Sequence, residues 1–331
     1  MKKFKKIIRA VLVLAVLAGL IYLIPKVITV VRLKRAADSY VAASSVSTFK
    51  DSKTTIIYDT NDQELCTMKN TKDMYYVSYQ EIPVTLVNSF VVMEDRQFYK
   101  HSGYDIKAIL RAIVINQKSN DIAQGASTIT QQLARNIFLS QEVTWQRKVE
   151  EIFIAVGLEK KYSKNQILEF YLNNIYFGNG YYGVEAAARG YFDKSVSELT
   201  LAEQTFIAAI PNNPTRYNPL TNYDNTVQRK NLILQQLYEA DDIGSLDRYM
   251  AEIEEVVLNP HQTEEINNSV VTYARHCATE SLMSVSGFTF RYNFSSEDDY
   301  NAYEATYDTF YNMCQQKLLS GGYSIYTSID M

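Results

Sequence analysis

Cysteine is scarce in this chain of 331 residues, and its scarcity removes two classes of site. The three cysteines, Cys66, Cys277 and Cys314, are an odd number and lack the short spacing of a zinc site. The sequence therefore predicts neither a structural zinc nor a disulfide framework. A single Cys277–Cys314 bridge could form in an oxidising compartment.

Basic side chains are outnumbered by acidic ones over most of the chain. Residues 1–35 hold nine Lys and Arg and no Asp or Glu, whereas the rest holds 24 basic and 37 acidic side chains, a net charge of −13. Nucleic-acid binding relies on Lys and Arg to neutralise phosphates, so this acidic portion argues against a nucleic-acid partner. The few cations inside motifs become candidates for local recognition.

Charge is absent altogether from residues 10–25, which marks a candidate membrane anchor. With only Lys26 interrupting it, the apolar run of about 25 residues can cross a bilayer core of roughly 30 Å as a helix. A signal peptide, whose apolar region is usually about 7–15 residues, and a buried core helix are the alternatives. We expect a cytoplasmic tail at 1–6, an anchor at 7–31 and a juxtamembrane linker at 32–53.

The rest of the chain predicts small β segments and a long helical region. Thr54–Tyr58 and Glu64–Met68 are β-like runs around a turn, and residues 321–330 alternate with period two as a strand does. From Pro83 to about Tyr238, apolar residues recur at helical spacing. This central region is therefore predicted to be mostly α.

The helical region has one clear interruption and one notable end. Residues 210–219 carry three prolines and must be irregular. Residues 94–103, Glu-Asp-Arg-Gln-Phe-Tyr-Lys-His-Ser-Gly, directly follow an apolar stretch, so Glu94 and Asp95 stand where a buried helix ends. A carboxylate in such a place can act as a proton acceptor. A helix end with solvated charges explains the run alone equally well.

Three further blocks favour a catalytic role for the 94–103 run over a solvated helix end. They are Gly125–Asn136, Arg147–Glu151 and Ser163–Asn173. Together with 94–103, and in this order, they resemble the motifs of the peptidoglycan glycosyltransferases. Those enzymes form the amino-terminal module of class A penicillin-binding proteins and also occur alone. The resemblance covers about residues 54–240, and a fifth, less specific block is Arg229–Leu234.

The resemblance implies a mainly α, lysozyme-like glycosyltransferase domain, preceded by a single transmembrane helix and flanked by small β elements. We expect this domain at 54–260, with a β segment at 54–80. Residues 261–331 are expected to be the truncated start of a linker and transpeptidase region. No Ser-x-x-Lys, the transpeptidase nucleophile motif, follows Asn259, so penicillin binding is not expected.

The implied reaction polymerises lipid II into β-1,4 glycan strands, with inversion and release of undecaprenyl pyrophosphate. Glu94 matches the general base. Glu151, rather than Glu150, matches a second catalytic carboxylate that positions the pyrophosphate, directly or through a divalent cation such as Mg or Mn. Lipid II, the growing strand and the cell membrane are the expected partners, and division or wall-synthesis proteins are further candidates. The domain would lie outside the cytoplasm.

The chemistry of the motif residues also indicates roles for them, independently of the resemblance. Ser127 or Thr128 can cap a helix whose free N–H groups suit phosphate oxygens. Arg147 and Glu151 share a helix face, which also fits an ordinary surface ion pair. The residues that match substrate contacts are Asp95, Arg111, Ser127, Thr128, Gln131, Gln132, Arg135, Arg147, Lys148 and Asn173. Those expected to be structural are Phe98, His101, Gly103, Gly125, Lys164, Glu169 and Tyr171.

Some of these assignments have plain alternatives. Arg111 can equally be a solvated helix residue, and the apolar stretch 106–115 can be core rather than a flap that admits the lipid tail. Arg135 stands where a Lys is common in the family, which replaces a point charge with a planar fork. Two rival functions remain at this stage: a cell-wall hydrolase on a similar fold, and an inactive membrane scaffold of a wall-synthesis complex.

Overall fold

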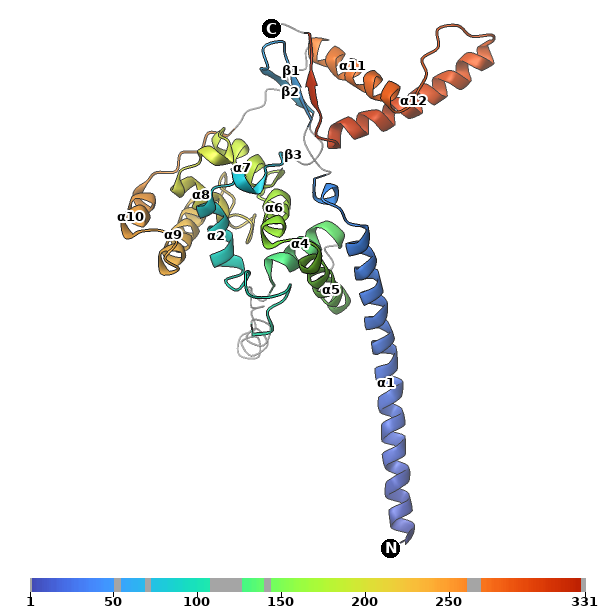
Figure 1. Ribbon diagram of the computed structural model, residues 1–331, viewed down its shortest axis with the longest axis vertical. Coiled ribbons are helices and arrows are strands. Elements are labelled where there is room, and N and C mark those ends of the chain that lie inside the picture. The colour runs from blue at the N-terminus through green and yellow to red at the C-terminus, as the bar shows by residue number, and fades with distance from the viewer. Residues whose placement is uncertain are drawn as a thin grey trace. The chain divides into compact units, whose positions relative to one another are not determined.

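The structure is a computed structural model that describes residues 2–50, 55–68, 73–107, 127–139, 144–260 and 269–328. Within these ranges it does not describe the side chains of residues 2–21, 66–68, 73, 270, 316 and 320. The described chain is mainly helical (Figure 1), as the sequence predicts. It forms two compact units: unit 1 is Met1–Ser44 with Gln97–Ile167, and unit 2 is Ser45–Arg96 with Leu168–Met331.

Unit 1 is built on α5 (Trp145–Lys161), which packs against both α1 (Lys2–Ala43) and α4 (Ile129–Phe138). Gly157 of α5 permits the close approach to α1, because a Cβ there would lie 2.8 Å from a methyl carbon of Val41. Lys161 donates from Nζ to the main-chain oxygens of Val41, at 2.7 Å, and of Ser44. This lysine satisfies carbonyls that the end of α1 leaves open, so the two helices are joined.

The predicted anchor and linker both fall on α1. Residues 7–21 of the anchor have side chains outside the described part of the structure. Over the described residues, we find no helix with the length and apolar character needed to cross a membrane. The predicted linker begins with the last turns of α1, where Ala37 is fully buried. The helix continues this far because no proline or glycine interrupts residues 26–43.

The helical part of unit 2 centres on α2 (Val84–Glu94), which packs against α8 (Leu201–Ala208) and α9 (Tyr223–Glu239). Leu86 and Phe90 of α2 are buried, which confirms the helical spacing seen in the sequence. Residues 210–219 are turns, as predicted. The other elements here are η1 (Ser47–Phe49), η2 (Tyr79–Glu81), α6 (Lys164–Asn174), which unit 1 shares, α7 (Val184–Phe192), η3 (Val196–Glu198) and α10 (Ser245–Ile253).

Unit 2 also contains a three-stranded sheet of order β2-β1-β5. The predicted β runs are confirmed as β1 (Thr55–Tyr58) and β2 (Glu64–Met68), which pair antiparallel. The terminal strand is shorter than predicted, β5 (Ser324–Tyr326), and it pairs parallel with β1. Two residues each from β3 (Asp73–Met74) and β4 (Tyr181–Tyr182) form a second, parallel pair.

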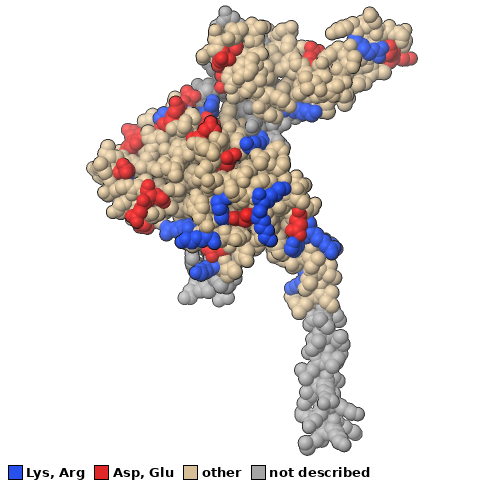
Figure 2. Space-filling view, viewed as in Figure 1, with Lys and Arg blue, Asp and Glu red and all other residues tan. Residues whose placement is uncertain are grey.

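A helical hairpin, α11 (Ser269–Val285) and α12 (Glu297–Ser320), packs against the three-stranded sheet. Ile57 and Leu65 of the sheet form one apolar cluster with Ala274 and Leu318 of the hairpin. On the face that Figure 2 shows, the hairpin carries few charged side chains, and some of them lie near the start of α12, which has an acidic first turn. Cys277 and Cys314 of the hairpin are free thiols, so the bridge considered from the sequence is absent.

Candidate active site

A cation and a buried carboxylate meet on the first turns of α5. Lys148 Nζ forms an ion pair with Glu151 Oε1 and donates a hydrogen bond to Ser127 Oγ at 2.8 Å. Of the two cations that helical spacing brings near Glu151, Lys148 rather than Arg147 makes this ion pair. Because Ser127 precedes α4, Lys148 links the start of α4 to the start of α5.

The start of α4 is capped as the sequence predicts. Thr128 is the N-cap, and its Oγ1 accepts a hydrogen bond from the Gln131 main-chain N–H at 3.1 Å. The Gln131 side-chain oxygen accepts in return from the Thr128 N–H at 2.9 Å, which completes a capping box. Because the Gln131 side-chain oxygen is used in the cap, its Nε2 group is the part of the amide that remains for another partner.

The helices α4 and α5 hold most of the unpaired buried polar atoms. Among the described residues, seven buried side-chain atoms lack a hydrogen-bond partner, and four of them are Gln131 Nε2, Arg135 Nε, Arg147 Nε and Glu151 Oε2. Three of these four are N–H donors. A buried polar group without a partner costs about 1–3 kcal/mol, so such a concentration needs an explanation. A ligand rich in acceptor oxygens, such as a phosphate, would satisfy the donors.

A second buried carboxylate, Glu159, joins three of the sequence blocks. Its Oε1 accepts from Thr130 Oγ1 at 2.6 Å and from Lys164 Nζ at 2.8 Å, and it lies 3.7 Å from His101 Nδ1. Lys164 also donates to the His101 main-chain oxygen and lies over the ring of Phe98. This role of Glu159 was not predictable from the sequence, because Glu159 precedes two lysines, a pattern typical of an ordinary solvated helix end.

Gly103 fixes the turn that closes the first block. Its backbone has φ +103°, and an added Cβ would lie 2.8 Å from the main-chain carbon of Ala155 in α5. Its N–H donates to His101 Nδ1 at 3.0 Å, and its carbonyl accepts from Thr128 Oγ1 at 2.8 Å. A side chain at this position would be strained and would clash, so the glycine is required by close packing.

Glu94 belongs to unit 2 and Glu151 to unit 1. Glu94 is the last residue of α2, and Asp95 is its C-cap, with its N–H bonded to the Val91 oxygen at 3.0 Å. Glu94 Oε1 lies 3.9 Å from Arg229 Nη2 of α9, and both side chains are mostly buried. The sequence indicated a carboxylate pair at a helix end but assigned no partner to Glu94.

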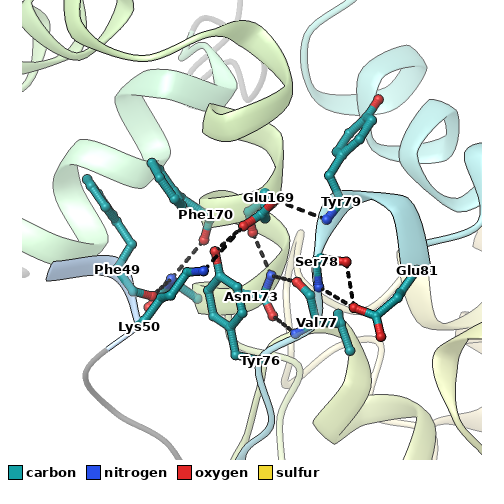
Figure 3. A network of polar contacts seen from close by, with 11 residues as sticks. Phe49, Lys50, Tyr76, Val77, Ser78, Tyr79, Glu81, Glu169, Phe170 and Asn173 are labelled. Atoms are coloured by element: carbon teal, nitrogen blue, oxygen red, sulfur yellow. Dashed lines mark hydrogen bonds and ion pairs between the residues drawn. The ribbon is translucent and has the colours of Figure 1, made fainter. Parts of the chain in front are cut away.

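The fourth block forms a network of polar contacts in unit 2 (Figure 3). Glu169 accepts hydrogen bonds from the Tyr76 hydroxyl and, at 3.0 Å, from the Tyr79 main-chain N–H. Lys50 Nζ lies 3.9 Å from Glu169 Oε1 and 4.4 Å from the centre of the Tyr76 ring. Desolvation, followed by this hydrogen bond to Glu169, raises the pKa of Tyr76, so its hydroxyl stays a donor.

The one Ser-x-x-Lys spacing in the sequence, Ser47 to Lys50, ends in this network. The Lys50 amine is engaged with Tyr76 and Glu169, and Ser47 Oγ hydrogen-bonds with Ser45 Oγ at 2.6 Å. These contacts place the two side chains in a structural setting rather than in a nucleophile and base pair.

Asn173 lies at the centre of the same network and is fully buried. Its Oδ1 accepts from the Val77 N–H, and its Nδ2 donates to the oxygens of Val77 and Glu169, all at 2.8–2.9 Å. The resemblance matches Asn173 to a substrate contact, but every polar atom of its side chain is used within the protein. We therefore place it in the scaffold, with Tyr171, which is buried against Phe90.

Replacing Asn173 with Ala is expected to lower the free energy of unfolding by about 2–4 kcal/mol, because the Val77 N–H and C=O and the Glu169 C=O lose the partner that this fully buried side chain provides. Thermal or urea unfolding of the full chain measures this. The exposed Asn312 of α12 is the matched control, and its replacement with Ala should change stability by less than about 0.5 kcal/mol. A stable Asn173 variant that instead binds its substrate poorly would restore the substrate-contact role.

The remaining predicted residues are placed as follows. Arg111, Gly125 and nearly all of the 106–115 stretch lie outside the described residues. Gln132 and Arg135 lie on α4, and Arg147 lies on the first turn of α5. Unit 1 therefore brings together the predicted residues from Ser127 to Glu151, and unit 2 holds Glu94, Asp95 and the end of the fourth block, with Glu169, Tyr171 and Asn173.

The described residues near Glu151 provide few ligands for the divalent cation that the resemblance allows there. Among the described residues, no group of three His, Cys, Asp or Glu side chains could hold a metal ion. Glu151 offers one oxygen without a partner, Oε2, while its other oxygen contacts Lys148. One oxygen beside an ammonium group does not make a resident metal site, so we derive no step through a cation.

Comparison with known proteins agrees with the sequence blocks. The penicillin-binding protein 4 of Bacillus subtilis (strain 168) is 40% identical over 258 residues, which cover 77% of this chain and 40% of that protein. The penicillin-binding protein 1A of Aquifex aeolicus (strain VF5) is 43% identical over 198 residues, covering 60% of this chain and 25% of that protein. The chain thus spans less than half the length of these relatives.

A solved structure and a family model complete the comparison. The crystal structure of penicillin-binding protein 1A from Haemophilus influenzae matches 84% of this chain and 27% of its own, at 20% identity and a TM-score of 0.41, which is too low to define the fold. The model of the transglycosylase family matches residues 61–238, more than half of the chain. By this match, the chain belongs to the transglycosylase family.

Proposed function

We propose that this protein is a membrane-anchored peptidoglycan glycosyltransferase that polymerises lipid II. The proposal includes a lysozyme-like fold for residues 54–260 and a catalytic domain outside the cytoplasm, next to the membrane that holds the lipid substrate. Membership of the transglycosylase family supports the activity. The basic first residues and the apolar run to Val31 support the anchor.

The proposed step is an inverting displacement at the anomeric carbon of the growing strand. Glu94 takes the proton of the acceptor's 4-hydroxyl while that oxygen forms a bond to the anomeric carbon. The bond from the same carbon to the pyrophosphate oxygen breaks, and undecaprenyl pyrophosphate leaves with the electron pair. Such a reaction needs a base at one end and positive charge at the other.

The observation that carries the proposal is the set of unpaired donors on α4 and α5. Gln131, Arg135 and Arg147 each have a buried N–H group that lacks a partner among the described residues. Lys148 adds an ammonium group, held between Ser127 and Glu151. A departing pyrophosphate carries several acceptor oxygens and negative charge, so it fits these donors. Glu151 would then orient Lys148 and the pyrophosphate.

A hydrolase that cuts finished glycan would also need a catalytic carboxylate. It has no leaving diphosphate, so it would not need three arginine and glutamine donors gathered on two adjacent helices. A scaffold without activity would need no buried donors at all, because each one costs stability.

Incubation of the full chain in detergent or membrane vesicles with lipid II, and separately with finished glycan strands, tests the proposal. We expect polymer and released undecaprenyl pyrophosphate from lipid II, and no fragments from the glycan. Fragments without polymer would identify a hydrolase. No product in either assay, from protein whose unfolding is cooperative, would favour the scaffold.

A further inference from the structure

Arg229 belongs to the fifth and least specific sequence block, and the proposed step gives it no role. It lies on α9, which packs against α2. Its Nη2 atom is 3.9 Å from Glu94 Oε1, with the Arg229 side chain 13% exposed and that of Glu94 17% exposed. The two side chains therefore face each other in a mostly buried setting, where charge interactions are stronger than at the surface.

Glu94 stands where a carboxylate is electrostatically disfavoured. The last carbonyls of a helix carry about half a negative elementary charge, and Glu94 is the final residue of α2. Arg96 takes up one of these carbonyls by donating from Nε to the Val92 oxygen at 3.1 Å. The Arg229 guanidinium supplies positive charge to the carboxylate itself, from a different helix.

Arg229 is itself held in place. Its guanidinium carbon lies 5.0 Å from the centre of the Tyr217 ring, which is the geometry of a cation–π contact. The neighbouring Lys230 is fully buried and donates to the Ala251 oxygen at 2.8 Å, which ties α9 to α10. The Arg229 Nε atom is buried without a partner among the described residues, so those residues offer the guanidinium no second acceptor there.

We propose that Arg229 is the positioning residue of the base Glu94, an inference that rests on the proposed function and deepens it. Arg229 attracts one oxygen of the carboxylate and so fixes the direction of the other toward the acceptor's hydroxyl. It acts through Glu94 and touches neither sugar nor pyrophosphate. Removing it should lower the rate of the chemical step and leave substrate binding unchanged.

Steady-state polymerisation of lipid II by the full chain, with Arg229→Gln and Arg229→Lys, tests this role. For Arg229→Gln we expect kcat to fall about 100-fold, because a small displacement of a reacting group costs about that much, while KM stays within about twofold. For Arg229→Lys, which keeps the charge but lacks the planar fork, kcat should recover to within about tenfold of the wild type.

The chain offers a closely matched control in α10. Arg248 pairs with Glu252 Oε1 at 2.8 Å and lies 5.3 Å from the centre of the Tyr238 ring, so it has the same kinds of partner as Arg229. Arg248→Gln should leave kcat and KM unchanged. The melting temperatures of all variants, measured in parallel, correct kcat for the fraction of folded protein.

The following results would overturn the inference. A raised KM with unchanged kcat would make Arg229 a substrate contact. A lower melting temperature with wild-type kcat per folded molecule would make it a structural ion-pair residue. If Arg229→Lys recovered none of the kcat lost in Arg229→Gln, the positive charge of Arg229 would not be what positions Glu94. If the wild-type protein made no polymer, both the proposed function and the positioning role would be wrong. If Arg229→Gln were fully active and Glu94→Gln inactive, only the positioning role would be wrong.

Discussion

Glu94→Gln should reduce lipid II polymerisation by about 10³-fold or more, while the protein keeps its fold. The amide has nearly the shape of the carboxylate but cannot take up the proton of the acceptor's hydroxyl, and general bases contribute about 10²–10⁴-fold. Initial rates of polymer formation measure the loss. Glu94 ends α2 rather than lying inside its apolar core, so the melting temperature should change little.

The control for this variant removes a comparable carboxylate from the same unit. Glu252 also pairs with an arginine, Arg248, but lies on α10. Glu252→Gln should polymerise lipid II at the wild-type rate. Strand synthesis by Glu94→Gln at a rate near that of Glu252→Gln would rule out the base role.

A large loss, about 100-fold in kcat, is also expected for Glu151→Gln. Glu151 is only 1% exposed, and its Oε1 is paired with Lys148. With a neutral amide at this position, Lys148 loses the anion that holds it beside Ser127 and, in the proposed mechanism, directs it toward the departing pyrophosphate. The measurement is kcat for lipid II, with cooperative unfolding as evidence that the variant is folded.

The adjacent Glu150 provides the comparison that makes this result specific. Burial raises the pKa of the Glu150 carboxyl, so this residue also has a property expected of a functional acid. It is less buried than Glu151, and we expect Glu150→Gln to keep its rate within about twofold. If Glu150→Gln were the inactive variant and Glu151→Gln the active one, the catalytic register of α5 would be shifted by one residue.

Local features of the fold were predictable from the sequence because they depend on neighbours in the chain. The period of Leu86 and Phe90 indicated the buried face of α2, and prolines marked the irregular 210–219 segment. A cap at Ser127 or Thr128 was predicted from the loop that runs into a helix there, and the structure shows that Thr128 is the N-cap. The resemblance located Glu94, Glu151 and the α4 donors; their roles stay predictions until the variants are assayed.

Contacts between segments that are distant in the sequence could not be predicted from it. Glu159 binds groups from residues 101, 130 and 164, and no spacing in the sequence links these positions. Asn173 was matched to substrate, because a polar residue in a motif gives no sign that the main chain of Val77 and Glu169 uses all of its hydrogen-bonding groups. The continuation of α1 past residue 31 to Ala43 was also not predicted, since small polar residues at 36–53 are as typical of a linker as of a packed helix end.

The contact between α1 and α5 connects the amino-terminal helix mechanically to α5. Lys161 and Gly157 attach its carboxyl end to the helix that carries Arg147 and Glu151, without a hinge of glycine or proline between Lys26 and Ala43. A tilt or rotation of α1 would therefore act on α5 through these contacts. Mechanical force applied near the beginning of the chain would reach the helix of Arg147 and Glu151 through these contacts.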